Sequence, residues 1–183
     1  LLELRRRVRG PRAATGVQGF GRIHEQVRGR ELAVWANPQL ELYAKILPGG
    51  FLHFGYFDHP DERPEEISLA DLVRAQRRYA EVVLEHVVDP SAPVLDIGAG
   101  MGGMAAMLAD RGFRPVAVTP DRHQVTHIQA TLPGVEVVEG RFGDLGWAGR
   151  WGSFGTVLTC ESLQYLFLDT AVNTVARLLR HGG

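Results

Sequence analysis

The stretch that decides the fold is Val94-Leu95-Asp96-Ile97-Gly98-Ala99-Gly100-Met101-Gly102-Gly103. A short apolar strand runs into a glycine-rich turn, and a helical pattern follows over residues 101–111. Glycines at the first turn positions allow backbone angles that side chains forbid and let the backbone approach a ligand closely. The free amides at the start of the helix favour a carboxylate or a phosphate. The stretch therefore predicts a strand, a turn and a helix with a ligand site at the turn.

The rest of the chain after this unit alternates short β-branched runs with helical patterns, which is typical of βαβ units around a parallel sheet. The predicted strands are 94–97, 115–118, 135–138 and 154–158, and the predicted helices are 101–111, 121–131 and 169–179. We expect an α/β, Rossmann-like doubly wound parallel sheet with strand order 3-2-1-4. A doubly wound cofactor domain usually has about six strands, so we expect the C-terminal strands to be absent. Two explanations stay open: the chain is a fragment, or it is the ordered or retained part of a longer protein.

Three segments are predicted: a basic flexible arm over 1–22, a helical cap or lid region over 23–90, and an incomplete cofactor-binding domain over 91–183. The arm is rich in arginine and broken by glycines. From Ile23 to Leu47 the apolar spacing predicts helices interrupted near Asn37-Pro38. Ser68 opens a further helix, because Ser68 and Asp71 have the spacing of a capping box.

Composition excludes several classes of protein. The formal net charge of -1 gives no general reason to expect nucleic acid. We interpret the basic arm as a solvated segment, although a contact with phosphate or acidic lipid stays open. The single cysteine, Cys160, cannot form an internal disulfide, and no apolar stretch has the length of a membrane span. We expect a cytoplasmic protein without a metal site.

The turn alone does not identify its ligand, because Gly98, Gly100 and Gly103 also satisfy the dinucleotide fingerprint. Two neighbours argue against NAD. Asp96 stands where dinucleotide domains usually carry an apolar residue, and a carboxylate there can hold the turn's amides and attract an ammonium group. Thr119 ends the second strand, where NAD domains use an acid for the ribose hydroxyls.

The quoted stretch resembles the first motif of the class I S-adenosylmethionine-dependent methyltransferases, and the resemblance extends from about residue 51 to the end. It is closest to a branch with cyclopropane fatty acid synthases and with small-molecule methyltransferases that act on sugars, terpenoids and tocopherols. The segments that carry this resemblance are Phe51-Leu52-His53-Phe54-Gly55-Tyr56-Phe57-Asp58, Ser68-Leu69, Ala75-Gln76 and Ala117-Val118-Thr119-Pro120-Asp121-Arg122-His123-Gln124.

The resemblance implies S-adenosylmethionine as cofactor and S-adenosylhomocysteine as product. In this branch a threonine and a glutamine five residues later replace the usual ribose-binding acid, and a tyrosine closes over the methionine moiety. An arginine and an aromatic residue after the third strand border the adenine, although a core role for this aromatic ring stays open. The implied cofactor-binding residues are Tyr56, Asp96, Gly98, Ala99, Gly100, Thr119, Gln124, Arg141, Phe142 and Thr159.

The segment from Thr159 to Tyr165 corresponds to the part that faces both cofactor and acceptor in this branch. Cyclopropane synthases typically have Glu-His and several sugar methyltransferases have His-His where this chain has Gln164-Tyr165. The usual general base is therefore missing. We expect Glu161 and Tyr165 to orient the acceptor or to take its proton.

The predicted function is methyl transfer from S-adenosylmethionine to a small-molecule or lipid-like acceptor. Three alternatives stay open: a cyclopropane-type acyl-chain synthase, an NAD-dependent oxidoreductase, and a non-catalytic, methyltransferase-like binding module. We expect no nucleic-acid partner and no integral membrane segment. The fourth strand would have an unpaired edge, which predicts a homo-oligomer formed through that edge.

Overall fold

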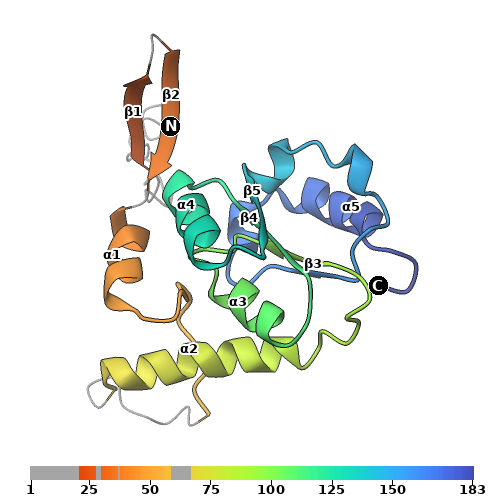
Figure 1. Cartoon of the computed structure of the whole chain (residues 1–183), viewed down its shortest axis with the longest axis horizontal. Coiled ribbons are helices and arrows are strands. Elements are labelled where there is room, and N and C mark those ends of the chain that lie inside the picture. The colour runs from red at the N-terminus through yellow and green to blue at the C-terminus, as the bar shows by residue number, and fades with distance from the viewer. Residues whose placement is uncertain (1–20, 28–29, 37, 59–66) are drawn as a thin grey trace, which may run out of the picture.

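A computed structural model describes residues 21–27, 30–36, 38–58 and 67–183 (Figure 1). Its centre is a four-stranded parallel sheet with the order β5-β4-β3-β6. The strands are β3 (Val94–Ile97), β4 (Pro115–Thr119), β5 (Glu136–Glu139) and β6 (Thr156–Leu158). In chain order this is 3-2-1-4, so the predicted topology is confirmed. Because the strands are parallel, their carboxyl ends lie at one edge of the sheet, which is where ligands bind in such folds.

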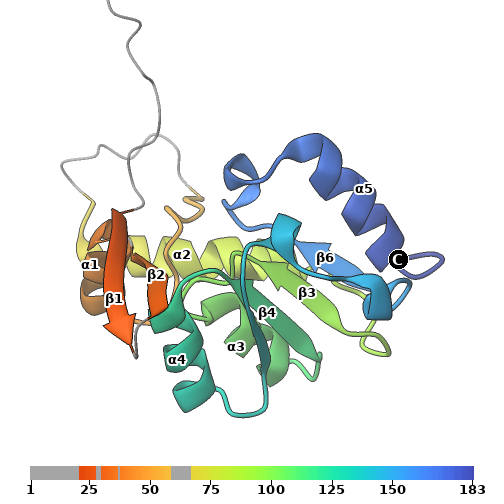
Figure 2. The ribbon, with the colours of Figure 1, turned by 90° about the horizontal axis from the view of Figure 1, so that it is seen from above.

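Helices cover both faces of the sheet. On one face lie α2 (Leu69–Leu84), α3 (Gly103–Asp110) and α4 (Arg122–Thr131), and on the other lies α5 (Leu168–Leu178) (Figure 2). Short 3-10 helices, η2 (Phe142–Asp144), η3 (Ala148–Arg150) and η4 (Leu163–Tyr165), connect the later elements. Every residue of β3 and β4 is buried. This two-sided burial explains their continuous apolar runs.

The start of α2 confirms the predicted capping box. The Ser68 hydroxyl accepts a hydrogen bond from the Asp71 amide at 3.2 Å, and the Asp71 carboxylate accepts one from the Ser68 amide at 2.8 Å. Two amides that the helix leaves free are thus paired. The buried residues of α2 are Ala75, Gln76, Ala80 and Leu84.

The prediction of helices between Ile23 and Asn37 was wrong. The chain there forms an antiparallel hairpin of β1 (Gly21–Val27) and β2 (Arg30–Ala36), and only α1 (Pro38–Ile46) is helical. The sequence of β2 contains Val34 and Trp35, which favour strands. Gly21 and Arg22, the last two residues of the predicted arm, lie in β1, and the first twenty lie outside the described residues. The hairpin lies beside α4 in both views (Figures 1 and 2).

The sheet ends at β6 on one side within residues 67–183. Among these residues, β6 pairs only with β3. An isolated parallel bridge joins Phe154, two residues before β6, to Leu179. The Arg180 amide donates to the Phe154 carbonyl at 2.9 Å, which places the end of α5 beside the entry to β6. No helix in the described part of the chain combines the length and apolar character of a membrane span.

Candidate functional site

The glycine-rich turn after β3 has the backbone that its sequence predicts. Gly98, Gly100 and Gly102 have φ values of +79°, +56° and +88°, in the left-handed region that favours glycine. The amides of Gly98 and Ala99 both donate to the carbonyl of Val118, at 2.8 and 3.1 Å. The turn is therefore fastened to the end of β4.

Side chains from distant parts of the chain pack against this turn. A Cβ atom built on Gly98 would collide with the side chain of Ser162, and one built on Gly100 would lie 3.2 Å from Leu52 Cδ1. The Ser162 hydroxyl donates to the carbonyl of Ile97. Gly98 itself is exposed. The turn thus keeps an open face between a segment from before α2 and the segment after β6.

Asp96 lies beneath the turn with only 1% of its surface exposed. Its Oδ2 atom is buried and has no hydrogen-bond partner, and burial raises the pKa of this carboxyl to about 7. Asp96 does not hold the amides of Gly98 and Ala99, because these two donate to the Val118 carbonyl of β4. A buried carboxylate oxygen without a partner is costly, and a cationic group at the turn would supply the missing hydrogen bond.

The predicted pair Thr119 and Gln124 meets at the end of β4. Both side chains are buried, and the Thr119 hydroxyl donates to Gln124 Oε1 at 2.6 Å. The Asp121 amide donates to Thr119 Oγ1 at 3.2 Å, and the Asp121 carboxylate caps α4. Because β3 and β4 are neighbours, this polar group lies beside the glycine-rich turn. It can hold hydroxyl groups of a ligand that extends along the strand ends.

Arg141 and Phe142 follow β5, one strand farther along the sheet. Arg141 is exposed, whereas Phe142 is buried with its ring 5.3 Å from the ring of Trp147. The Trp147 indole donates to the Phe142 carbonyl at 2.9 Å. Phe142 therefore packs in the core between the sheet and α5, and its role beside adenine stays a prediction.

The segment 51–57, called the lead-in segment from here on, crosses from the turn to α2. Gln76 Nε2 donates to the carbonyl of His53 at 2.5 Å and lies 3.4 Å from that of Phe51. The Tyr56 amide donates to the Ala75 carbonyl at 2.8 Å. The Tyr56 side chain is half exposed. The lead-in segment is thus held on α2 by backbone contacts, which leaves the Tyr56 ring at the surface.

The segment after β6 brings Thr159, Glu161 and Tyr165 to the same edge of the sheet. Glu161 has a φ of +53°, which is unusual for a residue with a side chain. Its Oε2 atom accepts a hydrogen bond from the Phe54 amide at 3.3 Å. Thr159 is half-buried, and Tyr165, in η4, is exposed. Glu161 therefore joins the lead-in segment to the strand ends.

No functional role was predicted from the sequence for His53, Gln76 and Tyr79. The His53 ring lies between Phe51 and Tyr79, with ring centroids 5.2 and 4.3 Å away. Burial lowers the pKa of His53 to about 4 and raises that of the Cys160 thiol, a neighbour of Tyr79, to about 12. In the sequence, His53 and Gln76 belong only to the segments that resemble a known family. Their contact could not be predicted, because no sequence pattern links residues 53 and 76.

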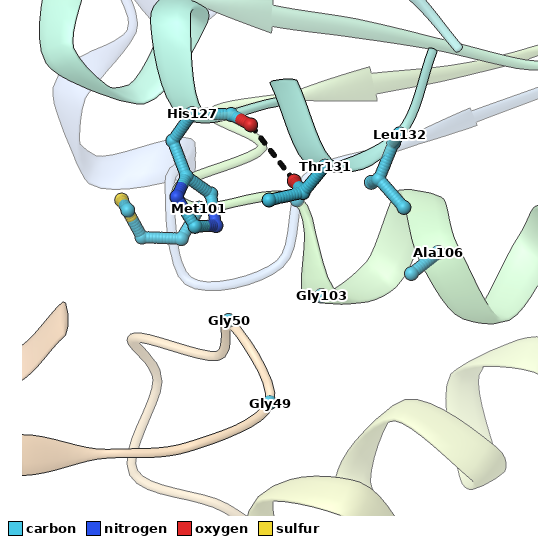
Figure 3. A pocket seen from close by; sticks show the side chains of 9 residues that line it. Gly49, Gly50, Met101, Gly103, Ala106, His127, Thr131 and Leu132 are labelled. Carbon is cyan, nitrogen blue, oxygen red and sulfur yellow. Dashed lines mark hydrogen bonds between the residues drawn. The ribbon is translucent and has the colours of Figure 1, made fainter. Parts of the chain in front are cut away.

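A cavity of about 220 Å³ lies behind the turn, between Gly49-Gly50 and the helices α3 and α4 (Figure 3). His127 and Thr131 of α4 line it, and the Thr131 hydroxyl donates to the His127 carbonyl at 2.8 Å. The cavity does not include Gly98 or Asp96, so it is separate from the exposed face of the turn. Among the described residues, no cluster of His, Cys, Asp and Glu side chains could hold a metal ion.

Comparisons with known sequences point to one family. Residues 94–183 match the family model described as a methyltransferase domain. An uncharacterised methyltransferase of Mycobacterium tuberculosis is 32% identical over 90 residues, which cover 49% of this chain and 36% of that protein. An O-methyltransferase of Pyrenophora dematioidea is 28% identical over 141 residues, or 73% of this chain and 51% of that protein. The chain thus spans about a third to a half of these relatives.

Solved structures share the fold at low sequence identity. A geranyl diphosphate C-methyltransferase from Streptomyces coelicolor, in complex with S-adenosylhomocysteine, has a TM-score of 0.62 and 22% identity, over 81% of this chain and 64% of that one. The (4+2)-cyclase SpnF has a TM-score of 0.63 and 21% identity, over 78% and 52%. Because one of these proteins is named a cyclase, the shared fold does not by itself specify a reaction.

Proposed function

Residues 94–183 form a methyltransferase domain of the class I, S-adenosylmethionine-dependent kind, and on this premise we propose that the chain transfers a methyl group to a small-molecule or lipid-like acceptor. The proposal concerns the whole protein, of which the described residues supply the cofactor side. It includes a cytoplasmic location, with which the single cysteine agrees.

The observation that carries the proposal is the unpartnered carboxylate oxygen of Asp96 under an exposed glycine turn. S-adenosylmethionine carries an ammonium group at its amino-acid end, and a buried carboxylate can accept a strong hydrogen bond from that group. An NAD pyrophosphate would instead bring negative charge towards Asp96. The residues present therefore fit the adenosyl cofactor better than a dinucleotide.

The remaining cofactor contacts follow the carboxyl edge of the sheet. Gly98, Ala99 and Gly100 would bind the amino-acid end through their backbone, and Thr119 with Gln124 would hold the ribose hydroxyls. When bound, S-adenosylmethionine supplies a methyl group on a sulfonium, which is a good leaving group. The chain's own task is then alignment of the acceptor and exclusion of water. The lead-in segment supports the second of these, since Leu52 already covers Gly100.

Glu161 is proposed to position the acceptor side of the site. Its carboxylate accepts from the Phe54 amide, so one oxygen can hold the lead-in segment while the other remains available to an acceptor. Tyr165 is proposed to contribute its hydroxyl from η4. We also propose that the span of residues 1–183, expressed alone, associates along the outer edge of β6 or is unstable, because unpaired strand edges favour association.

Isothermal titration of the chain with S-adenosylmethionine, S-adenosylhomocysteine and NAD tests the proposal. We expect both adenosyl ligands to bind and NAD not to bind. The D96N variant should lose affinity, whereas the matched D110N variant, at the exposed end of α3, should not. Binding of NAD alone would overturn the proposal in favour of an oxidoreductase, and binding of none of the three would favour a non-catalytic module.

A further inference from the structure

His53 is a half-buried residue whose polar side chain no contact in the described structure explains. Both ring nitrogens are buried and have no hydrogen-bond partner. The ring packs between two aromatic rings, those of Phe51 and Tyr79. An apolar ring would fill the same space without leaving a donor and an acceptor unpaired, which lowers stability. An unpaired buried polar group in a folded protein points to a catalytic role or to a bound molecule.

His53 also lies where the elements of the proposed site meet. The residue before it, Leu52, covers Gly100 of the turn. The amide of the residue after it, Phe54, donates to the Glu161 carboxylate. Tyr79, whose ring contacts the imidazole, interacts with Cys160 at the end of β6. The imidazole therefore packs against the lead-in segment and α2, and the segment that follows β6 contacts both of these through Glu161 and Cys160.

The contacts of Gln76 fix His53 in this place. Gln76 is buried, and its side-chain amide donates to the His53 carbonyl. The ring is also uncharged at neutral pH, because burial lowers the pKa of His53 to about 4. A neutral imidazole has one nitrogen that donates a hydrogen bond and one that accepts. The accepting nitrogen suits a ligand that brings its own N–H or O–H group.

We propose that His53 lines the acceptor side of the cofactor and presents a ring nitrogen to the nucleophile that receives the methyl group. The inference rests on the proposed function and adds a substrate class to it: an acceptor whose nucleophilic oxygen or nitrogen carries a hydrogen. His53 takes the place of the histidine that is missing at Gln164-Tyr165. It comes from the lead-in segment instead of the segment after β6.

Sinefungin and S-adenosylhomocysteine together test this inference without a known acceptor. Sinefungin carries an amine at the position of the transferable methyl group, whereas S-adenosylhomocysteine has no group there. In the H53F variant, which keeps an aromatic ring, we expect sinefungin to bind about tenfold more weakly, the equivalent of one charge-assisted hydrogen bond. The affinity for S-adenosylhomocysteine should stay within about twofold. The melting temperature of the free variant should rise.

The H53Q variant keeps a hydrogen-bond acceptor and should retain part of the preference for sinefungin. If H53F does not fold, the sinefungin affinity of H53Q tests the role of His53 instead. The H86F variant, at an exposed position, is the matched control. Equal weakening of both ligands, or unchanged binding of sinefungin, would overturn the role of His53 while the proposed function stands. If the wild-type chain binds neither ligand, the proposed function fails and this inference fails with it.

Discussion

Replacing Asp96 by asparagine should stabilise the free protein at alkaline pH and weaken cofactor binding. Burial raises the pKa of Asp96 from 3.8 to about 7, so the folded protein keeps a proton that the unfolded chain has lost. Between these two pKa values, stability therefore falls as the pH rises. The difference of about three pH units corresponds to about 4 kcal/mol of unfolding free energy, an upper limit for the gain from D96N.

Urea unfolding at several pH values measures this effect. Near pH 4 the Asp96 side chain is neutral in the folded state, so wild type and D96N should be about equally stable. Above about pH 8 the variant should be more stable by up to about 4 kcal/mol. The D110N variant corrects for the general effect of removing a negative charge. A D96N gain that is the same at all pH values, or a loss at alkaline pH, would refute the argument from burial.

The D96N variant also tests whether Asp96 contacts the ammonium group of the ligand. In the wild type, affinity for S-adenosylhomocysteine should increase as the pH rises through about 7, because the carboxylate that attracts the ammonium group becomes ionised. D96N should lack this increase and bind at least about tenfold more weakly at pH 8. Isothermal titration calorimetry measures both the affinity and its pH dependence. If D96N kept the wild-type affinity and pH dependence, Asp96 would not contact the ammonium group.

Three further variants separate stability from binding. S68A removes the capping box and should lower the unfolding free energy by about 1 kcal/mol in urea titrations, with unchanged affinity for S-adenosylhomocysteine. G98A places a side chain at a φ of +79° against Ser162 and should lower both the melting temperature and the affinity; unchanged affinity would remove the turn from the site. E161A removes the acceptor of the Phe54 amide and should speed hydrogen exchange of that amide; unchanged exchange would show that this hydrogen bond does not form in solution.

The sheet could be predicted from the sequence because its signals are local. The two central strands, β3 and β4, are short and mostly apolar, and parallel strands buried on both faces leave little ambiguity about which residues lie inside. The predicted strand 94–97 matches β3, and the predicted strand 154–158 starts two residues before β6. The hairpin of β1 and β2 could not be predicted in the same way. Its apolar residues also fit a helical spacing, and strand propensity depends on the pairing partner.

The site residues also divide into those that could be predicted from the sequence and those that could not. The turn at Gly98 was predicted from the local pattern of a strand, a glycine-rich turn and a helix, whereas the pair Thr119 and Gln124 was implied by the resemblance to a known family. The structure brings Thr119 and Gln124 into a direct hydrogen bond. The place of His53 could not be predicted, since it follows from contacts with Tyr79 on α2 and from the absence of any partner for its nitrogens. An unpaired buried atom is a property of the folded chain and leaves no pattern in the sequence.

The buried side-chain atoms without hydrogen-bond partners in the described residues belong to Asp96, His53 and Gln76. They come from β3, which leads into the glycine-rich turn, from the lead-in segment, which packs on that turn through Leu52, and from α2, which holds the lead-in segment through Gln76. Because each unpaired group lowers stability, the free protein should be less stable than an apolar core of the same shape would make it. A ligand that pairs these groups recovers that free energy on binding. D96N and H53F should therefore share one signature: a more stable free protein that gains less stability from its ligand.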